Sequence, residues 1–377
     1  MIPESEFNAE ALLAGILPWV EVESPTWHVA GVNRMMDLAA AEVQRLGGTI
    51  ERVPGVDGAG DIVIGRFPGA DPTAGKGILV LSHLDTVHLV GTLADKLPIR
   101  RQGNRCYGPG IYDMKGGVRI ALHAFDVVRR LDRSPRLPVT FMFVPDEEVG
   151  SPTSRARIEA EAKAHKYVLV TEPCKNGVIV TGRFAFQRFW VETKGRPAHA
   201  GANNRDGRSA IRAMASLVER IEGMTDFTRG MTFSVGTIEG GTFVNVMPIS
   251  CRAQVLTVAP NEPIFHEVRE RMMALAIEHD GVTISVTQGP VRPLWSPHMA
   301  TMALYERARL MSAELGFDLR HGSFGGGSDG NFTGALGVAT LDGLGVDGAG
   351  AHTFEEHLLV SSLPRSRLLA ELLARLD

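Results

Sequence analysis

Apolar residues recur along the chain with two different spacings, and together these predict an α/β protein. In residues 7–20 and 29–46 they recur every three or four positions, as on one face of a helix, and Gly47-Gly48 ends the second pattern. A third helical pattern covers residues 116–131. Nearly continuous runs of valine, isoleucine and leucine predict buried strands at residues 61–67, 77–82, 139–144 and 167–170.

Buried strands that alternate with helices are typical of a mostly parallel sheet with helices on both faces. Such sheets bind ligands beyond the carboxyl ends of their strands. Four acidic or histidine side chains closely follow predicted strands, namely His83, Glu147, Glu148 and Glu172. We therefore expect them to converge at one edge of the sheet.

From about Thr181 the pattern changes to the alternation of half-buried strands, seen first in residues 184–193. The elements that follow are a helix at 207–223, strands at 231–238 and 244–258, a helix at 264–279 and a strand at 282–287. This βαββαβ order predicts a small α+β unit whose open sheet edge could pair with a second copy.

Beyond residue 297 the first pattern returns, with a helix at residues 299–315, a strand at 338–342 and a helix at 363–376. A chain of 377 residues exceeds the comfortable size of a single core. We therefore expect a main domain formed by residues 1–180 and 291–377, interrupted by an inserted domain of residues 181–290.

The composition is that of a globular protein, with 44% hydrophobic and 22% charged residues. A net charge of −4 and the absence of a lysine- or arginine-rich block argue against nucleic acid and membrane surfaces as partners. The acidic N-terminal segment does not resemble a signal peptide, and no apolar run is long enough to span a bilayer.

The three cysteines, Cys106, Cys174 and Cys251, form an odd and widely spaced set. This favours a reducing, cytoplasmic location over a disulfide framework. Cys174 follows Glu172 closely, but a small half-buried residue is a simpler interpretation than a metal thiolate.

Histidines and carboxylates at the predicted strand ends form a ligand set that suits zinc and its neighbours. In LSHLDTV, His83 and Asp85 share one face of an extended segment, so Asp85 can hold the ring N–H of a metal-binding His83. Either residue alone has an ordinary structural interpretation. The pair, placed directly after a buried strand, indicates a metal site.

Asp113 lies in the glycine-rich segment GPGIYDMKGG, which opens a helix. The glycines let the backbone approach a ligand closely. The two oxygens of Asp113 can bridge two cations, as carboxylates do in two-metal sites. A helix N-cap is the alternative role, and this motif alone does not choose between the two.

The segment VPDEEVGS places Asp146, Glu147 and Glu148 at the end of a predicted buried strand. Three adjacent carboxylates repel one another there unless a cation neutralises them. A solvated acidic turn is the alternative. We expect Glu148 to bind metal and Glu147 to remain unligated, so that Glu147 can take a proton from activated water and pass it to a leaving nitrogen.

Glu172 in LVTEP and His352 in GAGAHTFEEH complete the set. We expect one divalent ion to bind His83, Asp113 and Glu172, and a second to share Asp113 with Glu148 and His352. Zinc suits these ligands best, and cobalt or manganese would also fit. A metal pair of this kind exists mainly to activate water, so the pattern is typical of a hydrolase.

These residues, together with other motifs, resemble a known family. The motifs SHLDTV, GPGIYDMKGG, PDEEVGS, TEP, GRPAHAG, GGTFVNVMP, GGGSDGNF and GAHT occur in the order and at the spacings of the two-metal amidohydrolases and metallopeptidases. That family contains aminoacylase, acetylornithine deacetylase, succinyl-diaminopimelate desuccinylase and the glutamate carboxypeptidases. The resemblance extends over nearly the whole chain and is strongest to the glutamate carboxypeptidase branch.

The resemblance implies a zinc-dependent catalytic domain (residues 1–180 and 291–377) interrupted by a dimerisation or lid domain (residues 181–290). It also implies a homodimer in which His199 of GRPAHAG reaches into the partner's site and stabilises an oxyanion. Asn245 is implied to hold substrate. Considered without the family, His199 could be a loop histidine and Asn245 a turn residue.

The turn containing Gly326, Gly327 and Ser328 could offer backbone N–H groups to an anionic end of the substrate. A phosphate-binding loop is a weaker interpretation of this turn, because the lysine of the GxxxxGK[ST] motif is absent.

One departure from the family pattern concerns the strand that follows Asn245. Family members commonly carry an arginine there that binds a substrate carboxylate, whereas this chain has Val258. An aliphatic side chain cannot donate the paired hydrogen bonds of arginine. Either Arg183, Arg188 or Arg205 takes over that role, or the substrate lacks a carboxylate at this point.

The sequence therefore predicts hydrolysis of a C–N amide bond, in a peptide or an N-acyl amino acid, by metal-activated water. Within enzymes, the alternative is a deacylase or aryl-amide hydrolase whose substrate lacks the usual carboxylate. Outside enzymes, the alternative is an inactive metal-stabilised binding protein, although an unligated Glu147 has no use in such a protein. A metal-free esterase is disfavoured.

Overall fold

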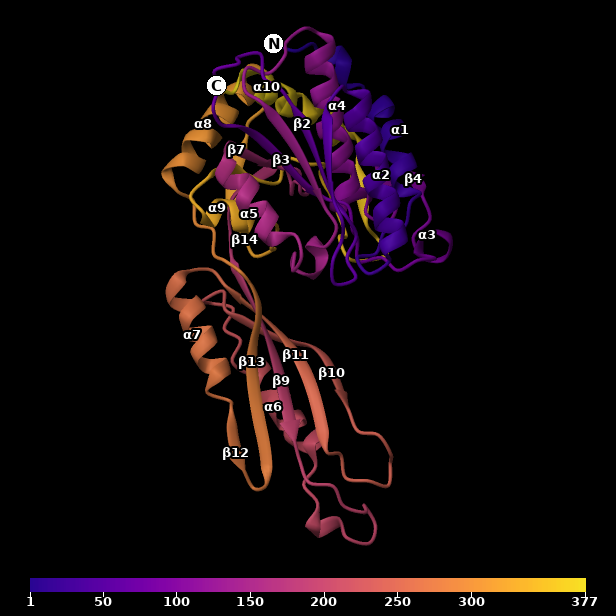
Figure 1. Ribbon diagram of the computed structural model, residues 1–377, viewed down its shortest axis with the longest axis vertical. Helices are drawn as coiled ribbons and strands as arrows, with labels where there is room; N and C mark the ends of the chain where they lie inside the picture. Colours follow the sequence, from indigo (N-terminus) through magenta and orange to yellow (C-terminus); the bar gives the residue numbers. More distant parts are fainter. The chain divides into compact units, whose positions relative to one another are not determined.

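The computed structural model describes all 377 residues, and the chain divides into two compact units. The first contains residues 1–182, 297–323 and 328–377, and the second contains residues 183–296 and 324–327. The second unit is thus inserted into the first along the chain (Figure 1). The predicted insertion, residues 181–290, compares with residues 183–296 here.

The first unit is built on a six-stranded sheet with the strand order β1-β2-β6-β3-β7-β15. Its strands are β1 (Thr49–Val53), β2 (Ile62–Phe67), β3 (Gly77–His83), β6 (Val139–Val144), β7 (His165–Val170) and β15 (Ala339–Leu341). The prediction of a mostly parallel sheet is confirmed, since β6, β3, β7 and β15 pair in parallel. The carboxyl ends of these four strands therefore meet at one edge.

Strands β1 and β2 form an antiparallel hairpin at one side of this sheet, and β2 also runs antiparallel to β6. The apolar run of β2 could not reveal its direction, because a buried strand shows the same residues in either direction. Strand β1 was not predicted, since Thr49, Glu51 and Arg52 interrupt its apolar residues.

Helices cover both faces of the sheet, as predicted (Figure 1). One face packs against α1 (Ala9–Val20), α2 (Val29–Arg45), α4 (Gly116–Arg130), α8 (Met299–Glu314) and α10 (Arg367–Arg375). The other face packs against α5 (Arg155–Ala164) and α9 (Gly330–Ala335). Val80 belongs to the first core and Leu79 to the second, because successive side chains of a strand point to opposite faces. None of the helices combines the length and apolar character needed to cross a membrane.

Smaller elements bring distant loops together at the carboxyl edge. A four-stranded antiparallel sheet has the order β16 (Gly348–Ala349), β17 (His357–Leu359), β5 (Arg105–Tyr107) and β4 (Arg100–Gln102). It places the GAGAHTFEEH segment beside the segment that leads into GPGIYDMKGG, because β17 pairs with β5. The remaining short elements are α3 (Thr92–Asp95) and the two-stranded sheet of β8 (Val178–Arg183) and β14 (Arg320–Phe324).

The second unit is a five-stranded antiparallel sheet with the order β10-β11-β9-β13-β12. Its strands are β9 (Ala185–Lys194), β10 (Thr232–Gly240), β11 (Ser250–Ala259), β12 (Ile277–His279) and β13 (Val282–Arg292). Helices α6 (Ala210–Glu222) and α7 (Glu262–Met273) share the apolar core of one face. The opposite face carries Trp190, Arg252 and Gln254, which line a surface hollow.

Three predicted elements of this unit are wrong in extent, and one of them, the strand expected over 282–287, continues to Arg292. The strand expected from residue 244 begins at Ser250, and Pro248 in the preceding loop has no N–H to donate to a strand ladder. The helix expected over 264–279 ends at Met273, and residues 277–279 form β12. The apolar residues of so short a strand fit a helical spacing equally well.

Candidate metal centre

His83 is the last residue of β3, and its side chain is buried. Its Nδ1 lies 3.0 Å from the backbone oxygen of Asp85 and 3.4 Å from a carboxylate oxygen of the same residue. The Nδ1–H therefore donates to Asp85, which leaves Nε2 to bind a metal ion. The Asp85 carboxylate also accepts the hydroxyl of Thr26 at 2.7 Å and the backbone N–H groups of Glu147 and Glu148 at 3.1 and 3.2 Å. Asp85 thus joins two of the predicted motifs.

Asp113 lies in a short turn, residues 111–115, that precedes α4. One of its carboxylate oxygens is 3.1 Å from Nε2 of His83, and the other is 3.4 Å from Nε2 of His352. A single carboxylate therefore lies between two imidazoles and directs one oxygen toward each. Asp113 caps no helix, because the N-cap residue of α4 is Lys115.

Glu148 follows β6 in a 3-10 turn, and its carboxylate lies 3.0 Å from Nε2 of His352. His352 belongs to the loop between β16 and β17 and has a left-handed backbone, with φ of 64°. This conformation is uncommon for a residue other than glycine, and such residues concentrate at functional sites.

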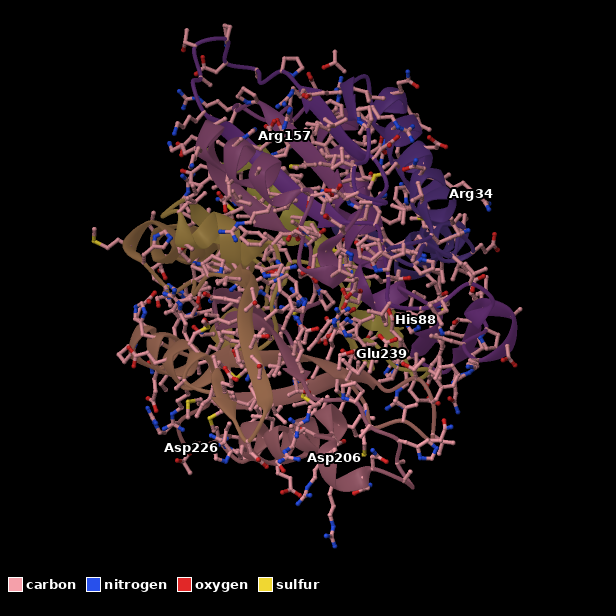
Figure 2. All side chains as sticks on the ribbon, turned by 60° about the horizontal axis from the view of Figure 1, so that its bottom comes forward. Arg34, His88, Arg157, Asp206, Asp226 and Glu239 are labelled. Atoms are coloured by element: carbon pink, nitrogen blue, oxygen red, sulfur yellow. The ribbon has the colours of Figure 1, made fainter.

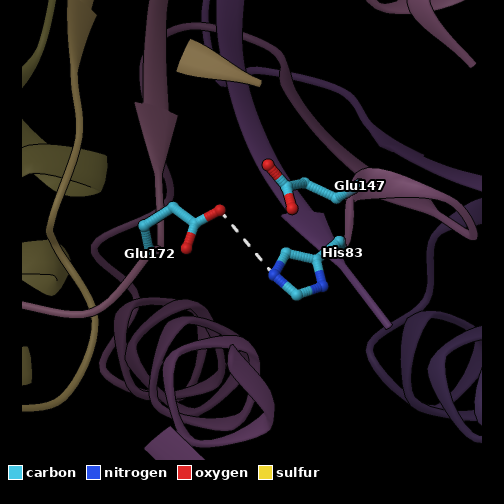
Figure 3. Close-up of side chains that lie close together, drawn as sticks. All are labelled: His83, Glu147 and Glu172. Atoms are coloured by element: carbon cyan, nitrogen blue, oxygen red, sulfur yellow. Dashed lines mark ion pairs between the residues drawn. The ribbon is translucent and has the colours of Figure 1, made fainter. Parts of the chain in front are cut away.

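Glu172 follows β7, and its carboxylate lies 3.7 Å from Nε2 of His83 (Figure 3). Ligand atoms of His83, Glu147 and Glu172 all lie within 4.8 Å of one another, and so do those of His83, Asp113 and Glu148. The carboxyl edge of the sheet therefore brings together side chains from five distant segments of the chain.

Glu148 and Glu172 are crowded enough to hold protons, whereas hydrogen bonds from His352 and His83 lower the pKa of Asp113. Burial raises the pKa of Glu148 to about 8, and the charge of Asp113 adds to the rise. Burial and the same charge hold the pKa of Glu172 well above its usual value. Hydrogen bonds with Asp113 and Glu148 raise the pKa of His352 to about 11. Burial alone would lower the pKa of His83, but its hydrogen bond with Asp113 raises it well above the usual value.

These pKa shifts are those expected of a site that binds cations. Buried carboxylates that repel one another keep their protons, or recruit protonated imidazoles, until a cation neutralises them. Two imidazole nitrogens with several carboxylate oxygens also form the donor set that zinc and related divalent metals prefer. Cys174 is not one of these donors, since its thiol donates to the backbone oxygen of Val178 and burial raises its pKa to about 11.

His199 and Asn245 lie in neighbouring exposed loops of the second unit, where the N–H of Ala200 donates to the backbone oxygen of Asn245 at 3.0 Å. The Nδ1 of His199 accepts the backbone N–H groups of Gly201 and Ala202 at 3.2 and 3.1 Å. The neutral imidazole therefore carries its proton on Nε2. This tautomer offers an N–H donor at the tip of the ring.

The glycine-rich turn divides between the two units. Gly326 and Gly327 belong to the second, where Arg183 donates to the backbone oxygen of Gly326 at 2.7 Å. Ser328 belongs to the first and is buried. Its backbone N–H donates to Asn331 at 3.0 Å and its hydroxyl donates to Asp342 at 2.6 Å. Residues 326–330 have the GxSxG spacing of esterases, but a serine hydroxyl held in this way is not an exposed nucleophile.

Strand register identifies an arginine that the sequence alone did not. Val258 of β11 pairs with Phe186 of β9, which in turn pairs with Arg292 of β13. Directly paired residues of an antiparallel sheet share one face, so Arg292 lies two strands from the position of the missing family arginine. A side chain atom placed on Gly327 would come within 2.9 Å of the Arg292 side chain, so the arginine stem packs against the glycine-rich turn. Arg188 pairs with Leu256 on the same face.

Glu356 is a second residue that the sequence analysis missed. Its buried carboxylate accepts the backbone N–H groups of Gly110, Tyr112 and Asp113 at 3.0, 2.9 and 3.0 Å. The same carboxylate lies 2.5 Å from Nε2 of His88, which is labelled in Figure 2. Glu356 thereby fixes the turn that carries Asp113. The backbone groups and the imidazole that it binds lie more than two hundred residues away, so no local motif could have revealed it.

A parallel α/β sheet that presents histidines and carboxylates at its carboxyl edge defines a metal-dependent hydrolase as the class of this protein. Residues 79–375 match the family described as Peptidase family M20/M25/M40, and the chain belongs to that family. The recognition made from the sequence motifs is thereby confirmed. The chain is an enzyme that hydrolyses amide bonds with the help of metal.

Two curated relatives illustrate the range of the family. The chain is 30% identical to carboxypeptidase G2 of Pseudomonas sp. (strain RS-16) over 360 residues, which cover 93% of this chain and 85% of the relative. It is 27% identical to acetylornithine deacetylase of Myxococcus xanthus over 231 residues, which cover 58% and 59% of the two chains. The crystal structure of aminopeptidase PepT from Bacillus cereus ATCC 10987 has the same fold, with a TM-score of 0.72, 21% identity and coverage of 98% of this chain and 99% of that one.

Proposed function

We propose that the chain is a two-zinc amidohydrolase that cleaves peptides or N-acyl amino acids. The observation that carries the proposal is the Asp113 carboxylate, which directs one oxygen toward His83 and the other toward His352. A carboxylate shared in this way suits the bridging position of a metal pair. Glu172 would complete one ion's ligands and Glu148 the other's. Cobalt or manganese would satisfy the same donors.

When bound, the metal ions lower the pKa of a water molecule and polarise the carbonyl of the substrate. Glu147 then accepts the proton of the attacking water and later gives it to the leaving nitrogen. Its buried position beside His83 and Glu172 supports this role. Asp85 accepts hydrogen bonds from the ring of His83 and from the backbone N–H of Glu147. It thereby fixes both a proposed metal ligand and the proposed base.

His199 would stabilise the oxyanion that forms on the carbonyl oxygen. Its Nε2–H tautomer, imposed by Gly201 and Ala202, is the one that can donate to such an oxygen without a charged imidazole. The family resemblance implies that this histidine reaches the site of a partner chain, so the proposal includes a homodimer formed through the second unit. Asn245, in the loop beside His199, would hold the substrate.

The substrate is proposed to be a small peptide or N-acyl amino acid, in line with the carboxypeptidase and the deacetylase among the relatives. Val258 favours one alternative, a deacylase or aryl-amide hydrolase whose substrate lacks the usual carboxylate. Gly326 and Gly327 are proposed to contact an anionic substrate end where one is present. A cytoplasmic location is proposed as well, supported by three buried cysteines that form no disulfide.

The test of this function is the variant Glu147→Gln, which keeps the size of the side chain and removes its basicity. We expect the purified variant to bind as much zinc as the wild-type protein, because Glu147 is not among the proposed ligands. Its kcat on N-acyl amino acids should fall by about 10²–10⁴-fold, the usual contribution of a general base.

Metal analysis and steady-state kinetics on a panel of dipeptides, N-acyl amino acids and aryl amides supply the measurements. A Glu147→Gln variant with near-normal turnover would contradict the proposed mechanism. A variant that had lost its metal would instead identify Glu147 as a ligand.

A further inference from the structure

A groove of about 510 Å³ lies beside α6 in the second unit. It is lined by residues of α6, of the loop before this helix, and of the hairpin formed by β12 and β13. Neither His199 nor Asn245 lines it, and neither does any proposed metal ligand. The groove is therefore separate from the proposed catalytic residues.

The charged lining of this groove is almost entirely positive. It consists of one carboxylate, Asp280, one imidazole, His279, and four arginines, namely Arg205, Arg208, Arg212 and Arg220. Because the whole chain carries a net charge of −4, this is a local concentration of positive charge. Arg208 neutralises the single carboxylate, since its Nε donates to the side chain of Asp280 at 3.2 Å and to its backbone oxygen at 2.9 Å.

The other three arginines, Arg205, Arg212 and Arg220, form no ion pair. They differ in this from Arg229 and Arg252 of the same unit, each of which pairs with a glutamate. Like charges that share a groove without a counterion repel one another. These three residues, called the unpaired arginines below, therefore favour a bound anion.

Helix α6 does not itself explain the position of these arginines. Arg212 lies in the first turn of the helix, where Ser209 is the N-cap and no acidic residue is present. The N-terminal end of a helix carries a partial positive charge, which favours anions and disfavours a cation. Arg220 lies about 12 Å further along the helix axis, so the positive charge extends beyond the reach of a single small anion.

The groove also has an apolar floor. Met247, Val282 and Ile284 line it and are half-buried, and Leu217 beneath them is buried. Ligand sites commonly combine apolar surface with a few polar groups that fix the orientation of the ligand, and their volumes are of this order. The lining therefore suits an organic anion better than an inorganic one.

The surface that suits a second copy of the chain lies on the other side of α6. Ile238, Phe243 and Val244, in β10 or just after it, are exposed apolar residues. Ile211 of α6 faces this side, since a Cβ atom placed on Gly241 would lie 3.2 Å from its Cδ1. Two grooves rich in arginine would repel each other, so we expect the groove to remain open in a dimer.

We propose that this groove binds a nucleotide that carries at least two phosphate groups. Arginine holds phosphate through paired N–H groups, and it is the cation best suited to this contact. A phosphate monoester carries about 1.5 to 2 negative charges at neutral pH, so two of them balance the three unpaired arginines. The base would lie on the apolar floor. This binding is independent of the proposed function, because no metal ligand takes part in it.

The test is calorimetric titration of the zinc-loaded full-length enzyme with adenosine 3′,5′-bisphosphate, which has two separate phosphate groups and a base. We expect its Kd to be at least tenfold lower than the Kd of inorganic phosphate or of adenosine. Arg212→Gln and Arg220→Gln should each raise the Kd of the bisphosphate roughly tenfold, as expected for the loss of a charge-assisted hydrogen bond.

The matched control is Arg269→Gln. Arg269 is an exposed arginine of α7 that forms no ion pair and lies outside the groove, so its replacement should leave the Kd unchanged. Glutamine has nearly the helix propensity of arginine, and circular dichroism should show that all three variants keep the wild-type helix content.

Three results would overturn the inference. The first is the absence of bisphosphate binding. The second is binding that Arg212→Gln and Arg220→Gln leave unchanged, which would place the ligand elsewhere, as at the metal ions. The third is equal affinity for citrate, a tricarboxylate without phosphate or base, which would show that the groove binds small polyanions by charge alone. None of these results bears on amide hydrolysis, and loss of amide hydrolysis would not affect this binding.

Discussion

Glu356 illustrates how a residue that touches no substrate can decide the geometry of a metal site. Three backbone donors of the turn around Asp113, those of Gly110, Tyr112 and Asp113, converge on its buried carboxylate. Without that acceptor the three N–H groups would be left unpaired, and the turn would rearrange to find other partners. The orientation of the proposed bridging carboxylate therefore depends on Glu356.

The change Glu356→Ala is expected to lower the affinity for zinc roughly 10–100-fold, the range typical of residues that orient metal ligands. Titration of the metal-free protein against a chromophoric chelator measures this affinity. Glu355→Ala is the matched control, since the neighbouring glutamate is exposed. Unchanged zinc affinity in Glu356→Ala, with a folded protein, would show that the turn holds Asp113 without it.

At the residue scale, the sequence predicted those side chains whose position follows from a strand end. His83, Glu148 and Glu172 each follow a run of buried apolar residues, and parallel strands end at a common edge. Glu356 could not be predicted in this way, because its partners are backbone groups set by the tertiary fold. Arg292 could not be predicted either, because its relation to Val258 depends on strand register.

At the scale of elements, the face of the second unit's sheet opposite α6 and α7 places a buried Arg292 two strands from Val258. Strands lie about 4.8 Å apart, so an arginine side chain can extend across the intervening strand toward the position that Val258 leaves without a cation. Its stem packs against the glycine-rich turn at Gly327. This arrangement predicts a replacement for the missing family arginine.

The change Arg292→Met should therefore reduce kcat/KM roughly tenfold or more for substrates with a free carboxylate, as expected for the loss of a charge-assisted hydrogen bond. The same amides with the carboxylate replaced by a carboxamide should be affected less. Arg252→Met, on the same face and exposed, serves as the control. An equal loss on both kinds of substrate would indicate that Arg292 supports the fold and does not bind the carboxylate.

The elements that the sequence predicted well are those with a strong and unbroken apolar pattern, such as β6 and α4. Those it missed are short or polar. In strand β1 the adjacent charged residues Glu51 and Arg52 separate Ile50 from Val53, and β12 is a three-residue strand that continues the apolar spacing of α7. In both cases pairing with a neighbouring strand, which is a tertiary contact, determines the conformation.

At the scale of the whole molecule, the change of pattern near Thr181 was enough to predict an insertion. The proposed mechanism also predicts its assembly into a dimer, because it needs His199 from a second chain. Mixing two inactive variants tests this directly. In a mixed dimer of Glu147→Gln and His199→Ala chains, one of the two sites would have both an intact base and an intact histidine.

After dissociation and random reassociation of equal amounts, we expect about a quarter of the wild-type specific activity, since half of the dimers are mixed and each has one complete site. Activity assays before and after mixing measure the recovery. Each variant treated alone should remain inactive. No recovery in a mixture that contains mixed dimers would mean that His199 acts within its own chain, and an active His199→Ala variant would mean that His199 does not act.

The parallel sheet of the first unit is completed only after the whole second unit has been synthesised. Strand β15, which pairs with β7, lies beyond the insertion, and His352 follows later still. At about 5–20 residues per second, the ribosome needs roughly 10–30 s to make the residues between β7 and β15. During that interval the emerging polypeptide exposes an unpaired apolar strand and lacks a ligand of its metal site. We therefore expect the nascent chain to be inactive and prone to misassociation until translation is almost finished.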